Sequence, residues 1–596
     1  MINKKNDENE ILWTRWCTNA EKYPDRDAII HWVAGEKPFR WTFSELIETA
    51  QSFSASLKEN GIKQGEVCAL IIRHNENLYP LYMAVSNIGA IPAVLAYPNP
   101  RLHPEKFRQG IEGMSHRSGL DWILTEKNLD PIIKPLVEKE ESTIKGIHFP
   151  LEWNKWKKQV QQSFNERQEE LSSNPVAKLA IPYKNFLKEI NELHRNIKST
   201  DPFLLQHSSG TTGLQKPVLL SHRAVLEHVE NYADSIKLKE KDKVVSWLPL
   251  YHDMGLIAAF HLPLAFGIPS VQINPFEWVM IPSLLMEVIS KEKATITWLP
   301  NFAYNMLADK VQDDELEGIS LGSMRMFINC SEPVRDESHK KLYNKYKKYG
   351  LKDEALSTCY AMAETTYAVT QTEPGKIPSV LILDRKEISK GRIKLIDNPE
   401  ISRTCVSSGK IIKGCEVKIV DENRKEIEED EIGEIAIKSV SMFDGYRNYP
   451  EKTAEVLEDG WYYSGDYGFR FGEEYYVIGR KKDIIIVAGN NIYPEDIEDA
   501  VSKVEGVIPG RVVAFGEEDP EIGSEQISVI SETKISDTEE QKKLKSAIIR
   551  AGMEMDISIR KIYLVPPRWL IKSSAGKPSR KANRERINKN EEIKWS

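Results

Sequence analysis

The sequence predicts an α/β protein built from two parts: a large multi-subdomain N-terminal region with mainly parallel sheets and a β-rich subdomain, and a small C-terminal α+β domain. Short β-rich runs alternate with helical patterns from about residue 41 to 368. A strand-rich pattern follows at about 409–478, and a pattern of both helices and strands follows residue 483. A chain of 596 residues is too long for one simple core, so division into domains is expected.

Strand and helix patterns alternate along the first of these stretches. Short apolar, β-branched runs are separated by segments whose apolar residues recur with helical spacing. Because parallel sheets bind ligands beyond the carboxyl ends of their strands, the loop after residues 203–206 stands at a favourable place. We expect strands at 67–72, 91–96, 203–206, 244–247 and 294–298, and helices at 78–88, from 222 onward, at 256–266 and at 301–308.

The later part of the chain has a different texture. Polar–apolar alternation at 415–420 and a glycine turn at Gly472 predict antiparallel strands within 409–478. Residues 138–200 are charged and helical without a motif, so we expect a peripheral excursion there. In the small domain we expect helices at 494–504 and 539–553 and strands near 512–515, 527–531 and 562–565.

Composition favours a cytoplasmic protein. The net charge is -8 and the pI is about 6.0, so no basic field indicates nucleic acid as a partner. The first ten residues lack the apolar stretch of a signal peptide, and the apolar run 254–271 is interrupted by His261, Pro263 and Pro269, so no membrane span is expected. The six cysteines have no metal-ligand or CxxC spacing, which suits reduced thiols.

The segment 205–216, Leu-Gln-His-Ser-Ser-Gly-Thr-Thr-Gly-Leu-Gln-Lys, has the composition of a phosphate-binding loop. Glycines let backbone N–H groups face an anion, hydroxyls add donors, and Lys216 adds a compact positive charge. The segment is not a Walker loop, because Gln215 replaces the second glycine and Pro217 follows the lysine. A kinase-like phosphotransferase is therefore a weaker interpretation, and an ordinary turn is the alternative for this segment taken alone.

Four further segments stand at predicted strand ends or in tight turns. Each alone is compatible with a solvated loop. They are Cys-Ser-Glu-Pro at 330–333, Tyr-Ala-Met-Ala-Glu-Thr-Thr at 360–366, Tyr-Ser-Gly-Asp-Tyr-Gly at 463–468 and Gly-Arg-Lys-Lys-Asp at 479–483. In this order, after the glycine-rich loop, they closely resemble the adenylate-forming superfamily, which includes acyl-CoA synthetases, adenylation domains of peptide synthetases and luciferases. The resemblance extends over nearly the whole chain.

The resemblance implies that the cofactors are ATP and Mg²⁺. Glu364 would hold the metal, a hard cation that prefers carboxylate and phosphate oxygens. Asp466 would accept hydrogen bonds from the ribose hydroxyls, and Arg480 would contact ribose or phosphate. The implied ATP-binding residues are Ser208, Ser209, Gly210, Thr211, Thr212, Gly213 and Lys216 at the phosphates, Ser331, Glu332, Pro333 and Tyr360 at adenine, and Ala361, Met362, Ala363, Thr365, Asp466 and Arg480.

The same resemblance implies catalytic roles for His252, Glu364 and Lys577. His252 would lie where the substrate carboxylate meets the α-phosphate, although a structural histidine is the alternative. Lys577, in the segment 571–577, would offset the negative charge that develops as pyrophosphate leaves; a basic tail is its alternative.

The resemblance also implies a domain boundary. Lys482 matches a hinge at 479–482 between a large N-terminal adenylation domain, 1–478, and a small C-terminal domain, 483–596. Adenylation and thiol attack need different surroundings, so one rotating domain would serve both steps.

Several segments look more specifically like fatty acyl-AMP ligases, which deliver acyl groups to the phosphopantetheine of an acyl carrier protein. They are Ala-Tyr-Pro at 96–98, Leu-Pro-Leu-Tyr-His-Asp-Met-Gly-Leu at 248–256, Pro-Asn-Phe-Ala-Tyr at 300–304, Glu-Pro-Val at 332–334 and Gly-Asn-Asn-Ile-Tyr-Pro at 489–494. An extra segment between Ala368 and Ser407 lies where that branch carries an insertion thought to restrict domain movement and coenzyme A use. A plain surface loop is the alternative.

We therefore expect a ligase that converts a carboxylic acid, of the fatty acid class, to acyl-AMP and then to a carrier-protein thioester. An acyl-CoA synthetase that uses free coenzyme A is the first alternative, and a catalytically silent nucleotide-binding homologue is the second. The intact Glu364, Asp466, Arg480 and Lys577 oppose the silent homologue. Ala488, where arginine is frequent, leaves the thiol acceptor open.

Overall fold

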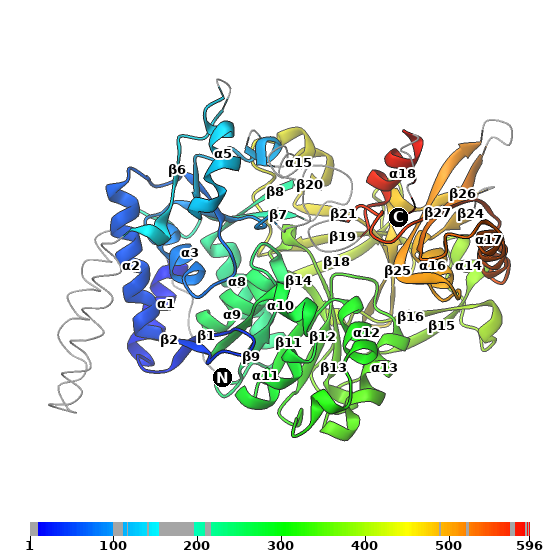
Figure 1. The fold of residues 1–596 in the computed structure, drawn as a ribbon, viewed down its shortest axis with the longest axis horizontal. Helices are drawn as coiled ribbons and strands as arrows, with labels where there is room; N and C mark the ends of the chain where they lie inside the picture. Colours follow the sequence, from blue (N-terminus) through cyan, green and yellow to red (C-terminus); the bar gives the residue numbers. More distant parts are fainter. Residues whose placement is uncertain are drawn as a thin grey trace.

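The computed structural model describes residues 10–98, 111–115, 117–139, 142–153, 196–208, 216–487, 490–519, 524–572, 578–589, 593 and 595. A large sheet and its helices form most of the molecule, and a smaller group of strands and helices from residue 485 onward lies at one end (Figure 1).

The large sheet has fourteen strands among the described residues. One half is parallel, as the strand–helix alternation predicts: β12, β11, β9, β10 and β1 lie side by side, with β13 beyond β12. The antiparallel strand β2 closes the edge beside β1. These strands are β1 (Asp27–Trp32), β2 (Phe39–Thr42), β9 (Val244–Ser246), β10 (Ser270–Ile273), β11 (Ile296–Leu299), β12 (Met326–Asn329) and β13 (Leu356–Ala361).

The other half of this sheet is antiparallel and corresponds to the predicted β-rich stretch. It begins earlier in the chain than residue 409, because β14 pairs with β13 and continues the same sheet. The turn at Gly472, with a φ of 62°, joins β21 to β22 as expected. The strands are β14 (Ala368–Gln371), β17 (Lys410–Ile411), β18 (Cys415–Val420), β19 (Gly433–Ser439), β20 (Leu457–Glu458), β21 (Trp461–Phe471) and β22 (Glu474–Arg480).

A second, four-stranded parallel sheet has the order β4-β3-β5-β6. Its strands are β3 (Val67–Ile71), β4 (Ile91–Val94), β5 (Trp122–Thr125) and β6 (Gly146–His148). The predicted topology is wrong for the strand that follows this sheet in the chain. β7 (Pro202–Ser208) does not lead through a loop into a helix as a parallel strand; it turns back as the antiparallel strand β8 (Lys216–Ser221), and only then does α8 (His222–Ser235) begin.

Helices cover the sheets, and their starts follow local sequence signals. Thr42 and Glu45 form a capping box at α2, and the Ser221 side chain caps α8. These helices are α1 (Leu12–Lys22), α2 (Phe43–Glu59), α3 (Leu78–Asn87), α5 (Asp130–Val137), α9 (Leu262–Ala265), α10 (Pro275–Met280), α11 (Leu284–Glu292), α12 (Asn301–Lys310), α13 (Asp336–Tyr346) and α15 (Pro450–Val456).

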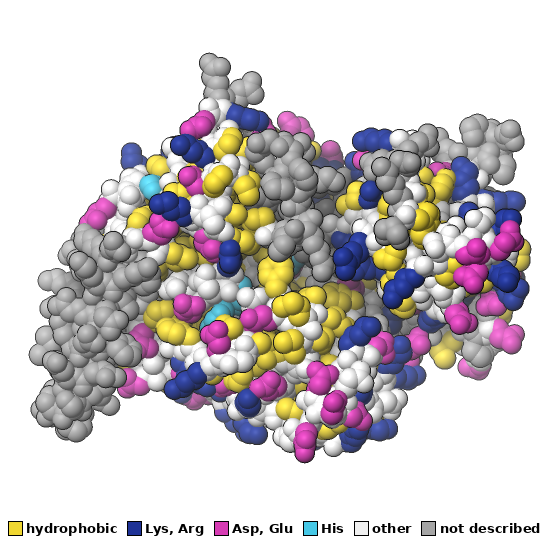
Figure 2. Space-filling view, in the orientation of Figure 1, with side chains coloured by type: hydrophobic (Ala, Val, Ile, Leu, Met, Phe, Trp, Pro, Cys, Tyr) yellow, Lys and Arg dark blue, Asp and Glu magenta, His cyan; other side chains and the backbone are white. Residues whose placement is uncertain are grey.

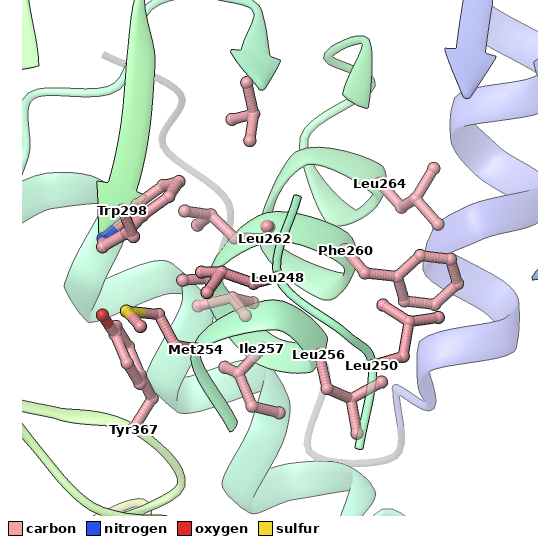
Figure 3. Close-up of a cluster of buried hydrophobic side chains, with 14 of the residues drawn as sticks. Leu248, Leu250, Met254, Leu256, Ile257, Phe260, Leu262, Leu264, Trp298 and Tyr367 are labelled. Carbon is pink, nitrogen blue, oxygen red and sulfur yellow. The ribbon is translucent and has the colours of Figure 1, made fainter. Parts of the chain in front are cut away.

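The segment predicted as a helix at 256–266 begins at Met254 with a π-helical stretch, Met254–His261, before α9. π-helical turns are rare and are often found at functional sites. All eight of its residues are buried. Figure 3 shows the packing that fixes it: Met254, Trp298 and Tyr367 lie at one side of the cluster, and Phe260 and Leu264 lie at the other.

The small C-terminal group is α+β, in agreement with the predicted class. β25 pairs antiparallel with β26, and β26 pairs parallel with β27. The elements are β23 (Ile485–Val487), β24 (Asn490–Ile492), α16 (Pro494–Ser502), β25 (Val507–Asp519), β26 (Ser524–Thr533), α17 (Thr538–Met553), β27 (Ile559–Val565) and α18 (Arg580–Asn588). The extra segment after β14 forms β15 (Val380–Asp384), α14 (Arg385–Ser389) and β16 (Ser402–Val406), with β15 and β16 paired antiparallel.

Two expectations from composition can be checked. All six cysteine thiols are free, and five of them are buried. Among the described residues, no helix is both long enough and apolar enough to cross a membrane.

Candidate active site

Asp466 and Arg480 face each other across the β21–β22 hairpin. They are register partners, and Arg480 Nε lies 3.2 Å from Asp466 Oδ1. The Tyr360 hydroxyl, at the end of β13, donates to Asp466 Oδ2 at 2.7 Å. The Asp466 charge raises the pKa of Arg480, so the guanidinium stays charged. Residues from segments more than a hundred positions apart therefore form one polar cluster.

The local chain holds Asp466 in place. Gly465 has a φ of 71°, which suits glycine, and its N–H donates to Glu434 Oε1 at 3.0 Å. The Ser464 hydroxyl accepts from the Asp466 N–H at 3.1 Å. The Asp466 side chain is 13% exposed while that of Arg480 is 47% exposed, so the pair opens to solvent on the arginine side.

A second polar chain connects Lys216, Tyr446 and Glu364. The Tyr446 hydroxyl donates to Glu364 Oε1 at 2.7 Å, and Lys216 Nζ donates to the same hydroxyl at 3.1 Å. Burial raises the pKa of Tyr446, so the hydroxyl keeps the proton that it donates. Burial lowers the pKa of Lys216, and the Glu364 charge opposes that effect. Lys216, the predicted phosphate-loop lysine, and Glu364, the predicted metal ligand, thus both contact the hydroxyl of Tyr446.

Glu364 is buried, with only 6% of the residue exposed, and lies in the 3₁₀ helix Ala363–Thr365. The turn is fixed from both ends, because the Met362 N–H donates to Tyr367 O and the Thr366 hydroxyl donates to Ser441 O. Thr366 has a φ of 69°, an unusual conformation for a β-branched residue. Such strain is typical of residues that a functional turn holds in place. Among the predicted neighbours, Ala361 ends β13 and the buried Thr365 donates to Met362 O.

The predicted adenine segments lie at adjacent strand ends. β12 and β13 are parallel neighbours, so Ser331 and Tyr360, which lie at their carboxyl ends, come to the same edge of the sheet. Ser331 has a φ of 68°. Glu332 Oε2 accepts from the Phe302 N–H at 2.9 Å, and Ser331 and Pro333 are exposed.

His252 lies just before the π-helical stretch. Its N–H donates to Pro249 O at 3.2 Å, and its ring lies 4.9 Å from the Tyr251 ring. The Gln206 side chain donates to Tyr251 O at 2.7 Å and links this turn to β7. A Cβ at Gly255 would stand 2.4 Å from Pro249 O, so the turn requires glycine.

An aromatic group lies near this turn. Trp247 stacks on Trp278 with ring centroids 3.8 Å apart, and Phe302 lies 6.2 Å from Trp247. This group joins Trp247, which follows β9, to Trp278 of α10 and Phe302 of α12, and no motif in the sequence connects the three. Figure 2 shows hydrophobic side chains gathered near α10 and α12. The exposed ones there are Phe276, Val279, Met280 and Phe302.

Two lysines in and near the small group have unusual acidity. The surrounding chain and the positive charge of Arg480 lower the pKa of Lys482 to about 8, although part of this side chain is open to solvent. Burial and the charge of Arg511 lower the pKa of Lys572 to about 8, while the carboxylates of Glu532 and Glu332 oppose the shift.

Several predicted residues lie outside the described part of the chain: Ser209, Gly210, Thr211, Thr212, Gly213 and Lys577, together with the Ser208 side chain. For these residues the sequence-based predictions stay as stated.

Sequence reasoning missed a buried contact between the extra segment and the small group. Arg403 of β16 is an ion-pair partner of Asp496 of α16 at 3.2 Å, donates to Ile478 O at 2.9 Å and lies 4.9 Å from the Tyr493 ring. Arg335 reaches the same Asp496 at 3.6 Å and donates to Glu495 O at 3.2 Å. No spacing in the sequence connects residues so far apart.

A parallel sheet that continues into an antiparallel half and is followed by a small α+β group is the fold of adenylate-forming enzymes. A solved structure from a study of fatty acyl-adenylate ligases of E. coli and Legionella pneumophila has this fold, with a TM-score of 0.83 at 23% identity over 98% of each chain. The chain belongs to the AMP-binding enzyme family, whose model matches residues 16–447.

Further similarities indicate ligases. A Mycobacterium tuberculosis protein named "Probable long-chain-fatty-acid–AMP ligase" is 30% identical over 406 residues, which is 63% of this chain and 68% of that protein. The medium-chain-fatty-acid–[acyl-carrier-protein] ligase of Moorena producens is 30% identical over 411 residues, 65% of this chain and 68% of that protein. The fatty acyl-adenylate ligase of L. pneumophila, solved with acyl adenylate and pyrophosphate, has a TM-score of 0.70 at 26% identity and covers 97% of this chain and 96% of its own.

Proposed function

We propose that this enzyme activates a carboxylic acid of the fatty acid class with MgATP, forms acyl-AMP and pyrophosphate, and transfers the acyl group to the phosphopantetheine thiol of an acyl carrier protein. The observation that carries the proposal is the convergence of Tyr360, Asp466 and Arg480 in one cluster and of Lys216 and Glu364 in another. Carboxylates, a lysine and an arginine are the groups that ribose, a metal and phosphates require.

The nucleotide would lie between these two clusters. Asp466 would accept hydrogen bonds from the ribose hydroxyls, and Arg480, with its more exposed side chain, would contact ribose or phosphate. Tyr360 and the 331–333 segment would border the adenine at the shared strand edge. The carboxylate of the acid would lie near His252, and Lys577 would contact it together with the α-phosphate.

Glu364 is suited to Mg²⁺. Its carboxylate is buried, one oxygen is bonded to Tyr446, and hard anionic oxygens are the ligands that Mg²⁺ prefers. When bound, Mg²⁺ supplies positive charge that offsets the charge of the phosphates. Lys216 would add a second positive charge, half-buried and fixed by Tyr446.

A fatty substrate is supported by an apolar group whose first member, Trp247, precedes the His252 turn in the chain. Trp247, Trp278 and Phe302 form an aromatic group, and exposed apolar side chains of α10 continue it at the surface. Apolar surface of this kind favours an alkyl chain over a polar acid. A carrier protein as acceptor is supported by the extra segment, because Arg403 connects it to α16 and would oppose rotation of the small group.

Substrate-dependent exchange of labelled pyrophosphate into ATP tests the first half of the proposal. Exchange with fatty acids of graded length would support it, whereas no exchange with any acid would favour a catalytically silent homologue. The second half is tested by supplying free coenzyme A and a phosphopantetheinylated carrier protein at matched concentration and measuring both thioesters by mass spectrometry. Equal rates would favour an acyl-CoA synthetase, with adenylation itself unaffected.

A further inference from the structure

We propose that Tyr446 is a positioning residue of the adenylation site, which holds the Glu364 carboxylate and the Lys216 ammonium in their places before MgATP binds. The inference rests on the proposed function, because it assigns Glu364 to the metal and Lys216 to the phosphates. It adds a residue that none of the sequence motifs indicates.

The Tyr446 hydroxyl makes both contacts at once. It donates its proton to Glu364 Oε1 at 2.7 Å and accepts from Lys216 Nζ at 3.1 Å. The Lys216 ammonium also lies 4.9 Å from the centre of the tyrosine ring, within range of a cation–π contact. Because the Tyr446 hydroxyl accepts from the Lys216 ammonium and donates to the Glu364 carboxylate, it fixes the orientation of both charged groups. One carboxylate oxygen is therefore occupied by Tyr446, and the other is left for a metal.

The chain around Tyr446 prevents the hydroxyl from moving. Tyr446 is 3% exposed, and its ring lies 5.0 Å from that of Phe443. Residues 444–447 pair antiparallel with β8: the Leu219 N–H donates to Gly445 O at 3.3 Å, and the Asp444 N–H donates to Leu219 O at 3.2 Å. The Arg447 N–H donates to Pro217 O at 2.9 Å. The Tyr446 N–H donates to the Thr453 hydroxyl at 2.9 Å. Because Lys216 begins β8, the same pairing holds both partners of the Lys216–Tyr446 contact.

Removing this hydroxyl would leave a buried carboxylate oxygen and a half-buried ammonium without the partner that orients them. MgATP would then have to order both groups as it binds, which weakens binding. A hydrogen bond to a charged group contributes about 1.5–3 kcal/mol, so Tyr446→Phe should raise the Kd for MgATP at least about tenfold. Metal-free ATP should lose less affinity, because it does not use Glu364.

The experiment measures nucleotide binding by titration calorimetry without any acid substrate, so that the result does not depend on turnover. Wild type, Tyr446→Phe and Tyr346→Phe are titrated with ATP with and without Mg²⁺. Tyr346 is the matched control: it is fully buried, and its hydroxyl donates to a backbone carbonyl, Leu307 O, at 2.9 Å. We expect a raised MgATP Kd for Tyr446→Phe alone, and a smaller effect of Tyr446→Phe in a Glu364→Gln background.

An unchanged MgATP Kd for Tyr446→Phe, with only a lowered Tm like that of Tyr346→Phe, would overturn the proposal and leave Tyr446 a core residue. If wild type itself does not bind MgATP, the proposed function fails instead, so the two failures are distinct. Should Tyr446→Phe not fold, Thr453→Val removes the acceptor of the Tyr446 N–H and keeps the tyrosine. It should raise the MgATP Kd about twofold to tenfold, and no change would contradict the role.

Discussion

Replacing Arg403 by leucine should let free coenzyme A compete as an acyl acceptor. Arg403 is 7% exposed and Asp496 16% exposed, so their contact across 3.2 Å is partly shielded from solvent. Breaking a buried ion pair costs about 3–5 kcal/mol. Here the cost is smaller, because the Arg403 Nη1 contact lacks hydrogen-bond alignment and Arg335 still reaches Asp496 at 3.6 Å.

We therefore expect Arg403→Leu to destabilise the observed arrangement by about 1–2 kcal/mol. This change corresponds to a shift of about fivefold to thirtyfold in the equilibrium constant for a rotation about residues 479–482. Acyl-CoA formation should rise within that range if the rotation limits access, while pyrophosphate exchange stays near the wild-type rate. Mass spectrometry of the thioester and exchange of labelled pyrophosphate measure the two half-reactions separately.

Lys503→Ala provides the matched control for Arg403→Leu. Lys503 and Glu337 also connect α16 to the large part, at 3.0 Å, but both side chains are more than half exposed. Exposed pairs contribute little, about 0–1 kcal/mol, so coenzyme A use should hardly change. The reasoning would be refuted if Arg403→Leu lowered the Tm without any gain in acyl-CoA, or if both variants gained equally.

Three further outcomes are expected. Lys577→Ala should slow adenylation by about 10²–10³ in pyrophosphate exchange while Lys572→Ala has a mild effect, and near-normal exchange in Lys577→Ala would contradict its role. Asp466→Ala should raise the KM for ATP much more than that for the acid, by about 1.5–3 kcal/mol of interaction energy, whereas equal effects on both would indicate a folding role. Lys482, whose pKa is lowered to about 8, should be mostly charged at pH 7 and mostly neutral at pH 9, so its labelling by amine reagents, followed by mass spectrometry, should reach its midpoint near pH 8; a midpoint near that of exposed lysines would refute this environment.

The sequence predicted elements whose signals are local. The helix that begins at His222 and the turn at Gly472 lie where periodicity and glycine indicated them. The β7–β8 hairpin was missed because the glycine-rich loop resembles a strand-to-helix connection until the pairing of β8 is known. The π-helical stretch at Met254–His261 depends on packing around it, which periodicity does not report.

The candidate site shows the same division. Glu364, Asp466 and Arg480 were selected because they lie in recognisable segments. The structure pairs Asp466 with Arg480 and Glu364 with Tyr446, and the roles of these residues stay predictions. Tyr446 and Arg403 carry no motif of their own, and their contacts join residues about eighty or more positions away. Long-range pairing of this kind is a property of the folded chain.

Under the proposed function, the position of Arg480 would link the bound nucleotide to the rotation of the small group. It is the last residue of β22, and the 3₁₀ helix Lys481–Asp483 follows without a spacer. A rotation that begins at Lys482 would leave the Asp466–Arg480 hairpin in place. It would change only which part of the small group faces the solvent-exposed side of the Arg480 guanidinium. Lys482 would then face a different surface when AMP is bound than when the site is empty. The rate of the rotation would therefore depend on which nucleotide the enzyme holds.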